Sequence, residues 1–513
     1  MPAVVTLGTS PRRTGFASLI LTMVVAALSR SAAAAQAQDE PIVATRHAVT
    51  IGGRTLRYTA RAGRLAIRDN EAGDVHGQMF FASYMLDRLP GSAPRPLTFV
   101  WNGGPGSNAA LVHLIGFGPK HMRPRPGAKP GDGTRWIIEP NPGTWLEETD
   151  LVFVDPIGTG YSRPTRAELG AEFYQTRGDA ESVAEFIRVY RTRFDAFDAP
   201  LFLAGESYGV TRAAGVADAL ETRGTDVRGV ILLGLALPLG TPPPTMRAAL
   251  GLPSLAVGAF VNGKLGPALQ RDLAATQREA EAWSSNAYAR ALARRDSLTD
   301  AERDSVIRAL ARFTGLNPSL VDRRTLVVDR MQLGNYLLRG EGKFIGQYDT
   351  RMVGPLDTVT TEYDPTKDPS LLDLLDDVMV VRYIREELGY RNDLKYQGPF
   401  GGGYPPATTF RGDWMSTRWN RSADSAGQQP LARAMRANPR LRVLAGCGIY
   451  DLVCDYYGIT WTASHLDQAM KRNVVAHSYP GGHAMYTDPR AHLQLKRDVA
   501  AFIREAMASV GSR

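Results

Sequence analysis

The distribution of apolar residues along the chain predicts six buried strands. These apolar runs are Leu97–Trp101, Leu151–Asp155, Leu201–Ala204, Val227–Leu233, Leu441–Ala445 and Val474–Tyr479. Several of them lack any alternation of apolar and polar residues, which is typical of strands that are covered on both faces. A helical pattern, "DAESVAEFIRVYRTRF" from Asp179, lies between the middle runs. Strands and helices that alternate in this way predict an α/β fold with a largely parallel sheet.

Two regions depart from this alternation. Residues 47–68 contain short alternating runs, which predict antiparallel strands. Residues 241–425 contain helical runs at 268–295 and 301–313, and a loop at 397–410 that is rich in glycine and proline. We interpret 241–425 as a mostly helical cap insertion that divides an α/β core into residues 38–240 and 426–513. A separate second domain at the same place would give the same pattern.

The N-terminal residues 1–37 have the pattern of a signal peptide. A basic start with Arg12 and Arg13 precedes an apolar stretch from Phe16 to Leu28, and Ala35-Gln36-Ala37 offers a cleavage site. The apolar stretch is short for a membrane span, and a permanent N-terminal anchor is the alternative. We expect an exported protein, periplasmic or extracellular, with no stable membrane span after cleavage. The arginine pair leaves both general and twin-arginine export open.

Composition and charge exclude some functions. The 513 residues are 44% hydrophobic and 22% charged, which is enough apolar material for a large core. Residues 1–37 carry three arginines and no acidic residue, so the formal net charge of +8 falls to +5 without them. No dense Lys/Arg tract occurs, so we expect no binding to nucleic acid. The two cysteines, Cys447 and Cys454, fit either a disulfide or two free thiols.

The strongest chemical motif is "GESYG", residues 205–209, which follows the apolar run at 201–204. A helix-compatible sequence comes next, so the motif lies between a strand and a helix. In that context G-x-S-x-G predicts a nucleophile elbow, a crowded turn that presents a serine hydroxyl. Ser207 is therefore the candidate nucleophile.

A nucleophilic serine needs a histidine as base, and in this arrangement the histidine follows the serine in the chain. Four histidines do so: His465, His477, His483 and His492. We favour His483 because it lies in a glycine-containing loop directly after the last strand, where such folds build their sites. His477 lies within that strand and is expected to be a packed core residue, and the other two lie in helical sequence.

The base in turn needs a carboxylate that follows the preceding strand. Asp451 and Asp455 both follow the run at 441–445, and we favour Asp451 because it is nearer to the strand end. The glycine-rich segment "WNGGPG", residues 101–106, also follows a strand. Its bare backbone predicts a loop that supplies an N–H donor to an oxyanion, with a second donor from Tyr208.

These segments together resemble the serine carboxypeptidase family. "WNGGPG", "GESYG", Gly448-x-x-Asp451-x-x-Cys454 and "GGH" occur in the family's order, and "TWLEETDLVFVDPIGTGYS" (Thr144 to Ser162) resembles a fifth signature. The resemblance covers about 97–500. It implies a bacterial member of that family with an α/β-hydrolase fold, a mostly parallel central sheet and a helical cap. It also implies that Asp451 is the acid of the triad.

The resemblance implies a role for each matching residue. The triad is Ser207, Asp451 and His483, the oxyanion donors are Gly104 and Tyr208, and the residues that bind a substrate carboxylate are Asn102, Gly103 and Glu206. Peptide or protein C-termini would be the substrates, and neither a metal nor an organic cofactor is implied. Because two carboxylates repel each other, Glu206 should be protonated when it binds the substrate carboxylate.

Three departures from the family pattern concern specificity more than hydrolysis. Ser107-Asn108 stands where members often carry Cys-Ser, Gly116 stands where a glutamate commonly pairs with the one beside the serine, and "VTRAAG" replaces an aromatic-rich stretch after the elbow. An esterase or acyltransferase on the same scaffold is therefore the main alternative function. A catalytically inactive binding protein is a third.

Overall fold

The computed structural model describes residues 40–127, 136–240, 242–356, 367–372, 374–398 and 430–508. The expected signal peptide, most of the predicted loop at 397–410 and the expected end of the cap insertion at 425 lie outside these residues. The fold described below is that of Ile42–Arg513, the larger of the two units into which the chain divides.

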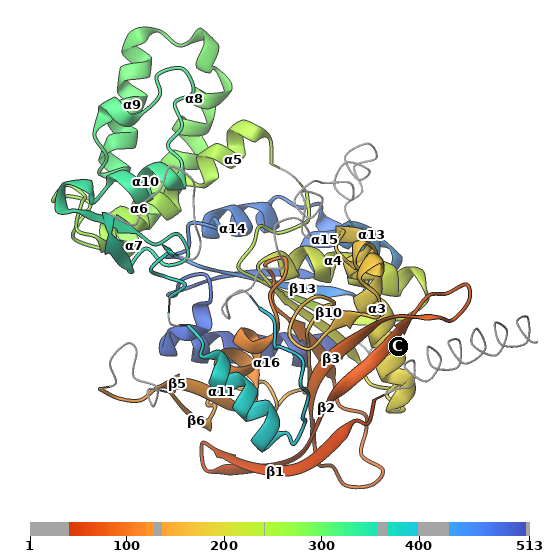
Figure 1. The fold of residues 1–513 in the computed structure, drawn as a ribbon. Helices are drawn as coiled ribbons and strands as arrows, with labels where there is room; N and C mark the ends of the chain where they lie inside the picture. Colours follow the sequence, from red (N-terminus) through yellow and green to blue (C-terminus); the bar gives the residue numbers. More distant parts are fainter. Residues whose placement is uncertain are drawn as a thin grey trace, which may run out of the picture. The chain divides into compact units, whose positions relative to one another are not determined.

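A ten-stranded sheet forms the centre of this unit (Figure 1). Its strands follow the order β1 (Val43–Ile51), β2 (Arg54–Arg68), β3 (Val75–Leu86), β7 (Asp150–Val154), β4 (Leu97–Trp101), β9 (Leu201–Glu206), β10 (Val227–Leu233), β13 (Arg442–Gly448) and β14 (Val474–Tyr479), while β8 (Arg163–Pro164) pairs with β3. From β7 to β14 every pair is parallel, and these are the six strands that the sequence predicts.

The first three strands form an antiparallel extension of the sheet. Two of them, β1 and β2, occupy the segment where alternating runs predict antiparallel strands, and β3 pairs antiparallel with both β2 and β7. Strand β3 is not among the strands that the sequence predicts. Its middle residues, from Gly77 to Tyr84, are buried without alternation, so its pattern does not separate a strand from a buried helix.

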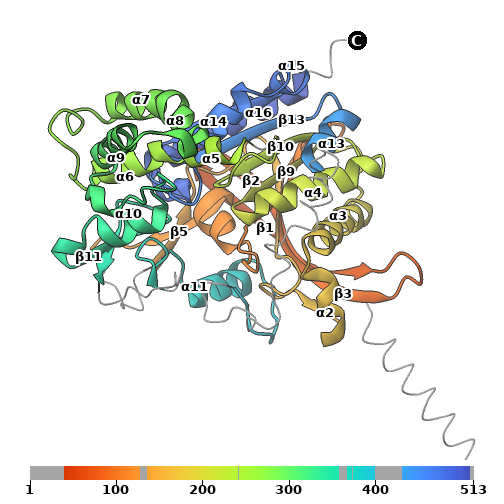
Figure 2. The same ribbon diagram turned by 90° about the horizontal axis from the view of Figure 1, so that it is seen from above.

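Helices cover both faces of the sheet, because successive side chains of each central strand point to opposite sides. Phe99 and Trp101 of β4 belong to one hydrophobic cluster with α3 (Thr176–Arg193), α4 (Tyr208–Thr222) and α13 (Pro430–Ala437). In Figure 2, α3 and α4 lie side by side along this face. Val100 belongs to a second cluster with α16 (Pro489–Ala508) and the π-helical turn η1 (Val112–Phe117).

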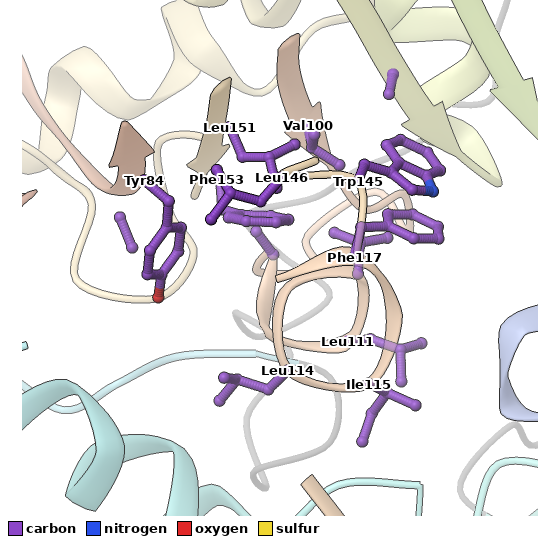
Figure 3. Packing of buried hydrophobic residues seen from close by; sticks show 14 of the residues in the cluster. Tyr84, Val100, Leu111, Leu114, Ile115, Phe117, Trp145, Leu146, Leu151 and Phe153 are labelled. Atoms are coloured by element: carbon purple, nitrogen blue, oxygen red, sulfur yellow. The ribbon is translucent and has the colours of Figure 1, made fainter. Parts of the chain in front are cut away.

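Figure 3 shows part of the second cluster, in which η1 packs beneath the strands. The ring of Phe117 stacks on Trp145 with 3.7 Å between centroids, and Leu151 and Phe153 of β7 lie beside this pair in the same cluster. Burying large side chains of this kind contributes about 1.5–3 kcal/mol each. The cluster holds η1 against the sheet, a few residues after the glycine-rich segment at 101–106.

A group of helices with its own hydrophobic core follows β10. It comprises α5 (Pro244–Leu250), α6 (Leu252–Val261), α7 (Leu273–Trp283), α8 (Ala289–Ala293), α9 (Asp300–Thr314) and α10 (Arg330–Tyr336), drawn mainly in green in Figure 1. Helix α9 begins with a capping box between Thr299 and Glu302 and ends at Gly315, whose φ of 68° closes the last turn. The short strands β11 (Lys343–Ile345) and β12 (Val353–Pro355) come after it.

One stretch of the described chain, Pro244–Val261, is long and apolar enough to cross a membrane by length and composition. It spans α5 and α6, and 56% of it is buried inside the structure.

Candidate active site

The candidate nucleophile lies at a strained turn between β9 and α4. The backbone of Ser207 has φ 55° and ψ −129°, which is unusual for a residue with a side chain and costs about 1–3 kcal/mol. Its N–H donates to the carbonyl of Leu233 over 2.7 Å, and its own carbonyl accepts from Val210 over 2.8 Å. A Cβ at Gly205 would lie 2.0 Å from the Gly209 carbonyl oxygen, so the turn requires glycine there. The motif therefore adopts the conformation that the sequence predicts.

A hydrogen bond joins His483 to Asp451. The His483 Nδ1 atom lies 2.6 Å from Oδ2 of Asp451, and both side chains are buried. The other carboxylate oxygen accepts the N–H of Val453 over 2.7 Å, which fixes the carboxylate on the loop after β13. On the far side of the imidazole ring, Nε2 is buried and has no hydrogen-bond partner among the described residues.

The imidazole lies beside the elbow. A Cβ built at Gly234 would lie 3.2 Å from Cε1 of His483, and Gly234 directly follows the carbonyl that accepts the Ser207 N–H. Burial alone disfavours a charged imidazole, but the Asp451 carboxylate and its hydrogen bond outweigh burial and raise the pKa of His483 above its ordinary value. Asp451 therefore orients His483 and stabilises its protonated form.

The alternative residues weighed from sequence lie elsewhere. Asp455 precedes α14 (Tyr456–Ser464), and burial raises its pKa to about 6, but His483 pairs with Asp451. His465 is exposed at the end of α14, and His492 in α16 donates Nε2–H to the Gly116 carbonyl. The expectation of a core position for His477 is wrong: its side chain is only half-buried, because β14 is an edge strand.

The glycine-rich segment after β4 rests directly on the elbow. A Cβ at Gly103 would come within 2.4 Å of the Tyr208 nitrogen and 2.8 Å of the Ser207 Cβ. Gly104 has φ +99°, a conformation that favours glycine. Only residues without a side chain can bring this backbone so close to the serine.

Glu206 lies at the centre of a buried polar network beside the serine. Its Oε2 accepts hydrogen bonds from the Asn102 amide and, over 2.8 Å, from the hydroxyl of Tyr486. Its Oε1 is buried without a partner among the described residues. Burial is the main cause that raises the pKa of Glu206, to about 7, against the lowering effects of His483 and the two donors. A protonated Glu206 has one oxygen available to bind a further group.

Tyr486 was not identified from the sequence. Its ring packs against Gly116, where a Cβ would lie 3.5 Å from two ring carbons. Gly116 leaves room for this ring, and the Tyr486 hydroxyl donates to Glu206. The only signal for this contact in the sequence is that a glycine stands at position 116 and a tyrosine stands three residues after His483.

A cavity of about 610 Å³ brings most of the predicted site residues together. Those that line it are Asn102, Gly103, Gly104, Glu206, Ser207 and His483; Tyr208 and Asp451 lie behind them. Leu111, Met352, Leu371, Leu372, Leu374 and Leu375 add an apolar wall. Arg351, also in the lining, bridges the carboxylates of Asp349 and Asp488.

A disulfide joins Cys447, in β13, to Cys454, in the loop that carries Asp451. The sequence left a disulfide and two free thiols open, and the structure has the bonded form. The bond closes a short loop around Asp451.

Comparison with known proteins relates part of the chain to a known family. Residues 59–225 match the family model of serine carboxypeptidases. Similar curated proteins include pheromone-processing carboxypeptidases of three fungi. The enzyme of Tuber melanosporum is 28% identical over 30% of this chain and 22% of its own length. The enzyme of Sclerotinia sclerotiorum is 31% identical over 26% of this chain and 19% of its own length. That of Eremothecium gossypii is 28% identical over 40% of this chain and 32% of its own length. The matches thus span only about a fifth to a third of these relatives.

One solved structure has the same fold over most of both chains. The prohormone-processing carboxypeptidase Kex1 of Saccharomyces cerevisiae superposes with a TM-score of 0.53 and 16% identity, covering 87% of this chain and 92% of that one. The fold is therefore that of the α/β hydrolases, with a mostly parallel central sheet. Residues 59–225 of this fold are thus similar to the serine carboxypeptidase family.

Proposed function

We propose that the protein is an exported serine-type carboxypeptidase that removes residues from peptide or protein C-termini through an acyl-enzyme. The observation that carries the proposal is one cavity lined by a strained serine, a histidine bound to a buried carboxylate, and a buried glutamate with one unpartnered oxygen.

In this proposal Ser207 Oγ attacks the carbonyl carbon of the last peptide bond while Nε2 of His483 takes the hydroxyl proton. Asp451 holds the imidazole in the required tautomer through Nδ1. The N–H groups of Gly104 and Tyr208 stabilise the oxyanion. The C–N bond then breaks, His483 returns the proton to the leaving amine, and water hydrolyses the acyl ester by the same steps.

The substrate's free carboxylate binds to Asn102, Gly103 and Glu206. A neutral Glu206 can donate its proton to one carboxylate oxygen, and its raised pKa of about 7 supports that protonation state in mildly acidic and neutral solution. The Asn102 amide donor carries no charge and does not titrate, so it binds an anion at any pH. This carboxylate site is what distinguishes a carboxypeptidase from a general esterase.

Export and domain organisation are part of the same proposal. The signal-like residues 1–37 and a disulfide between the only two cysteines fit a periplasmic or extracellular enzyme. The helical group that begins at α5 would belong to a cap insertion over residues 241–425, between core segments 38–240 and 426–513.

The test uses two matched substrates and one variant. An N-blocked dipeptide with a free C-terminal carboxylate is compared with the same dipeptide as its C-terminal amide. The proposal predicts faster hydrolysis of the free acid by the wild type and no hydrolysis by S207A. Equal rates for both substrates, or hydrolysis of an ester that has no carboxylate with no hydrolysis of the free-acid dipeptide, would indicate an esterase or acyltransferase instead. No hydrolysis and no labelling by a fluorophosphonate would indicate a binding protein.

A further inference from the structure

Arg212 is a fully buried arginine one turn after the serine on α4. It is 1% exposed and lies in the "VTRAAG" stretch where the chain departs from the family pattern. Its Nε donates to Oδ2 of Asp179 over 2.7 Å, and Asp179 lies in the first turn of α3 and is also buried. A buried charge is costly unless it is paired and hydrogen-bonded, so a buried pair at this place requires an explanation.

The second contact of Arg212 reaches the glycine-rich segment. Its Nη1 donates to the backbone carbonyl of Asn102 over 2.6 Å, and its guanidinium carbon lies 5.2 Å from the centre of the Tyr208 ring. One side chain therefore contacts the residue after the nucleophile and the residue before Gly103, while its partner Asp179 anchors it to a third segment.

The contact with the Asn102 carbonyl has a directional consequence. In a trans peptide the C=O of one residue and the N–H of the next point in opposite directions. Among the described residues the only cis peptide is Gly104–Pro105, so the peptide between Asn102 and Gly103 is trans. The Asn102 carbonyl of this peptide points towards Arg212, so the Gly103 N–H points away from Arg212. Gly103 itself lines the cavity.

The side chain of Asn102 is held at the same time. Its Oδ1 accepts the N–H of Val112 over 3.1 Å, and its amide nitrogen donates to Glu206. Among the described residues, Arg212 is the only one whose charged side chain forms a hydrogen bond with the backbone of Asn102.

We propose that the buried Asp179–Arg212 pair is a positioning device for the carboxylate site: it fixes the Asn102–Gly103 peptide so that the Gly103 N–H and the Asn102 amide meet a substrate's C-terminal carboxylate. The inference rests on the proposed carboxypeptidase function and adds two residues that do not touch the substrate. It predicts that loosening the pair weakens binding of the free acid more than it slows chemistry at Ser207.

Two variants test the pair without relying on one that leaves a lone buried charge. R212K keeps a cation opposite Asp179, but one ammonium cannot replace the two-pronged donor geometry of arginine. D179N/R212M removes both charges at similar volume. The control is E181Q/R223M, which removes an exposed ion pair between the same two helices, away from the cavity.

The readout is the ratio of kcat/KM for the free-acid dipeptide to kcat/KM for its amide, measured on variants whose thermal unfolding shows them to be folded. We expect the ratio to fall about ten-fold in R212K and in D179N/R212M, mainly through KM for the free acid, because one aligned donor to a charged group is lost. The control keeps the wild-type ratio. If either variant is folded and keeps the wild-type ratio, the positioning role of Arg212 is wrong, but the carboxypeptidase proposal is not affected. A wild type that does not prefer the free acid would overturn the carboxypeptidase proposal, and this inference with it.

Discussion

The hydroxyl of Tyr486 donates a hydrogen bond to Oε2 of Glu206 over 2.8 Å, at the place where the Gly116 backbone leaves room for the ring. A phenol, unlike a carboxyl group, does not compete for the glutamate proton near neutral pH. The neighbour on Oε2 is therefore neutral, while the charges of His483 and Asp451 also act on the pKa of Glu206. The pH dependence of substrate binding tests the role of Glu206.

We expect kcat/KM for free-acid peptides to fall as the pH rises through about 7. Burial raises the pKa of Glu206 to about that value, and the ionised form repels the substrate carboxylate. The acidic limb belongs to His483, which must be neutral to accept the serine proton. Amide substrates should show the acidic limb without the alkaline fall. The variant E206Q should lose the alkaline fall for peptides, and an E206Q profile identical to that of the wild type would contradict the assignment.

Removing the Tyr486 hydroxyl should move the alkaline limb to higher pH. The hydroxyl donates to the carboxylate and so lowers its pKa; in Y486F this donor is lost and Glu206 keeps its proton further into alkaline solution. The measurement is the pH profile of kcat/KM for the free-acid dipeptide. Y288F is the matched control, because Tyr288 is also buried but donates to the Leu326 carbonyl among the helices after β10. If the alkaline limb of Y486F moved to lower pH instead, the hydroxyl would not lower the pKa of Glu206, and this prediction would be wrong.

Replacing Asp451 should abolish most activity with little loss of stability. In D451N the amide can keep a hydrogen bond to His483 but favours the wrong tautomer, and kcat should fall about 10⁴-fold. Asp455 lies in the same loop without contacting His483, so D455N should retain activity within a few-fold of the wild type. Steady-state kinetics of the two variants separate these outcomes. Comparable losses in both would mean that Asp451 has no special role.

The sequence predicts those elements whose signal is local. The buried strands, the elbow at Ser207 and the histidine loop after β14 each lie within a short stretch, and the structure brings Asp451 and His483 into contact as the motif order suggests. Tyr486 and Arg212 could not be predicted, because their partners Glu206 and Asn102 are distant in the chain. A tyrosine three residues after a histidine, or an arginine in a helix, has many possible positions until the fold selects one.

A methyl group at Gly103 should destabilise the fold and disrupt the site. The new Cβ would lie 2.4 Å from the Tyr208 nitrogen and 2.7 Å from the Glu206 carbonyl oxygen, and backbone atoms cannot yield as a flexible side chain could. We expect G103A to lose about 1–3 kcal/mol of unfolding free energy and most of its activity. G266A, where no atom lies within 4 Å of the new Cβ, is the control and should stay within about 0.5 kcal/mol of the wild type. Denaturant unfolding measures both.

The central claim, that His483 and Asp451 activate Ser207 as the nucleophile, is tested most directly by a fluorophosphonate that reacts with activated serines. Intact-mass and peptide mass spectrometry should find one adduct, on Ser207, in the wild type. The adduct should be absent in S207A and should form at least about 100-fold more slowly in H483A, in line with the contribution of a general base. Labelling that persists in S207A, or that proceeds at the wild-type rate in H483A, would contradict the account.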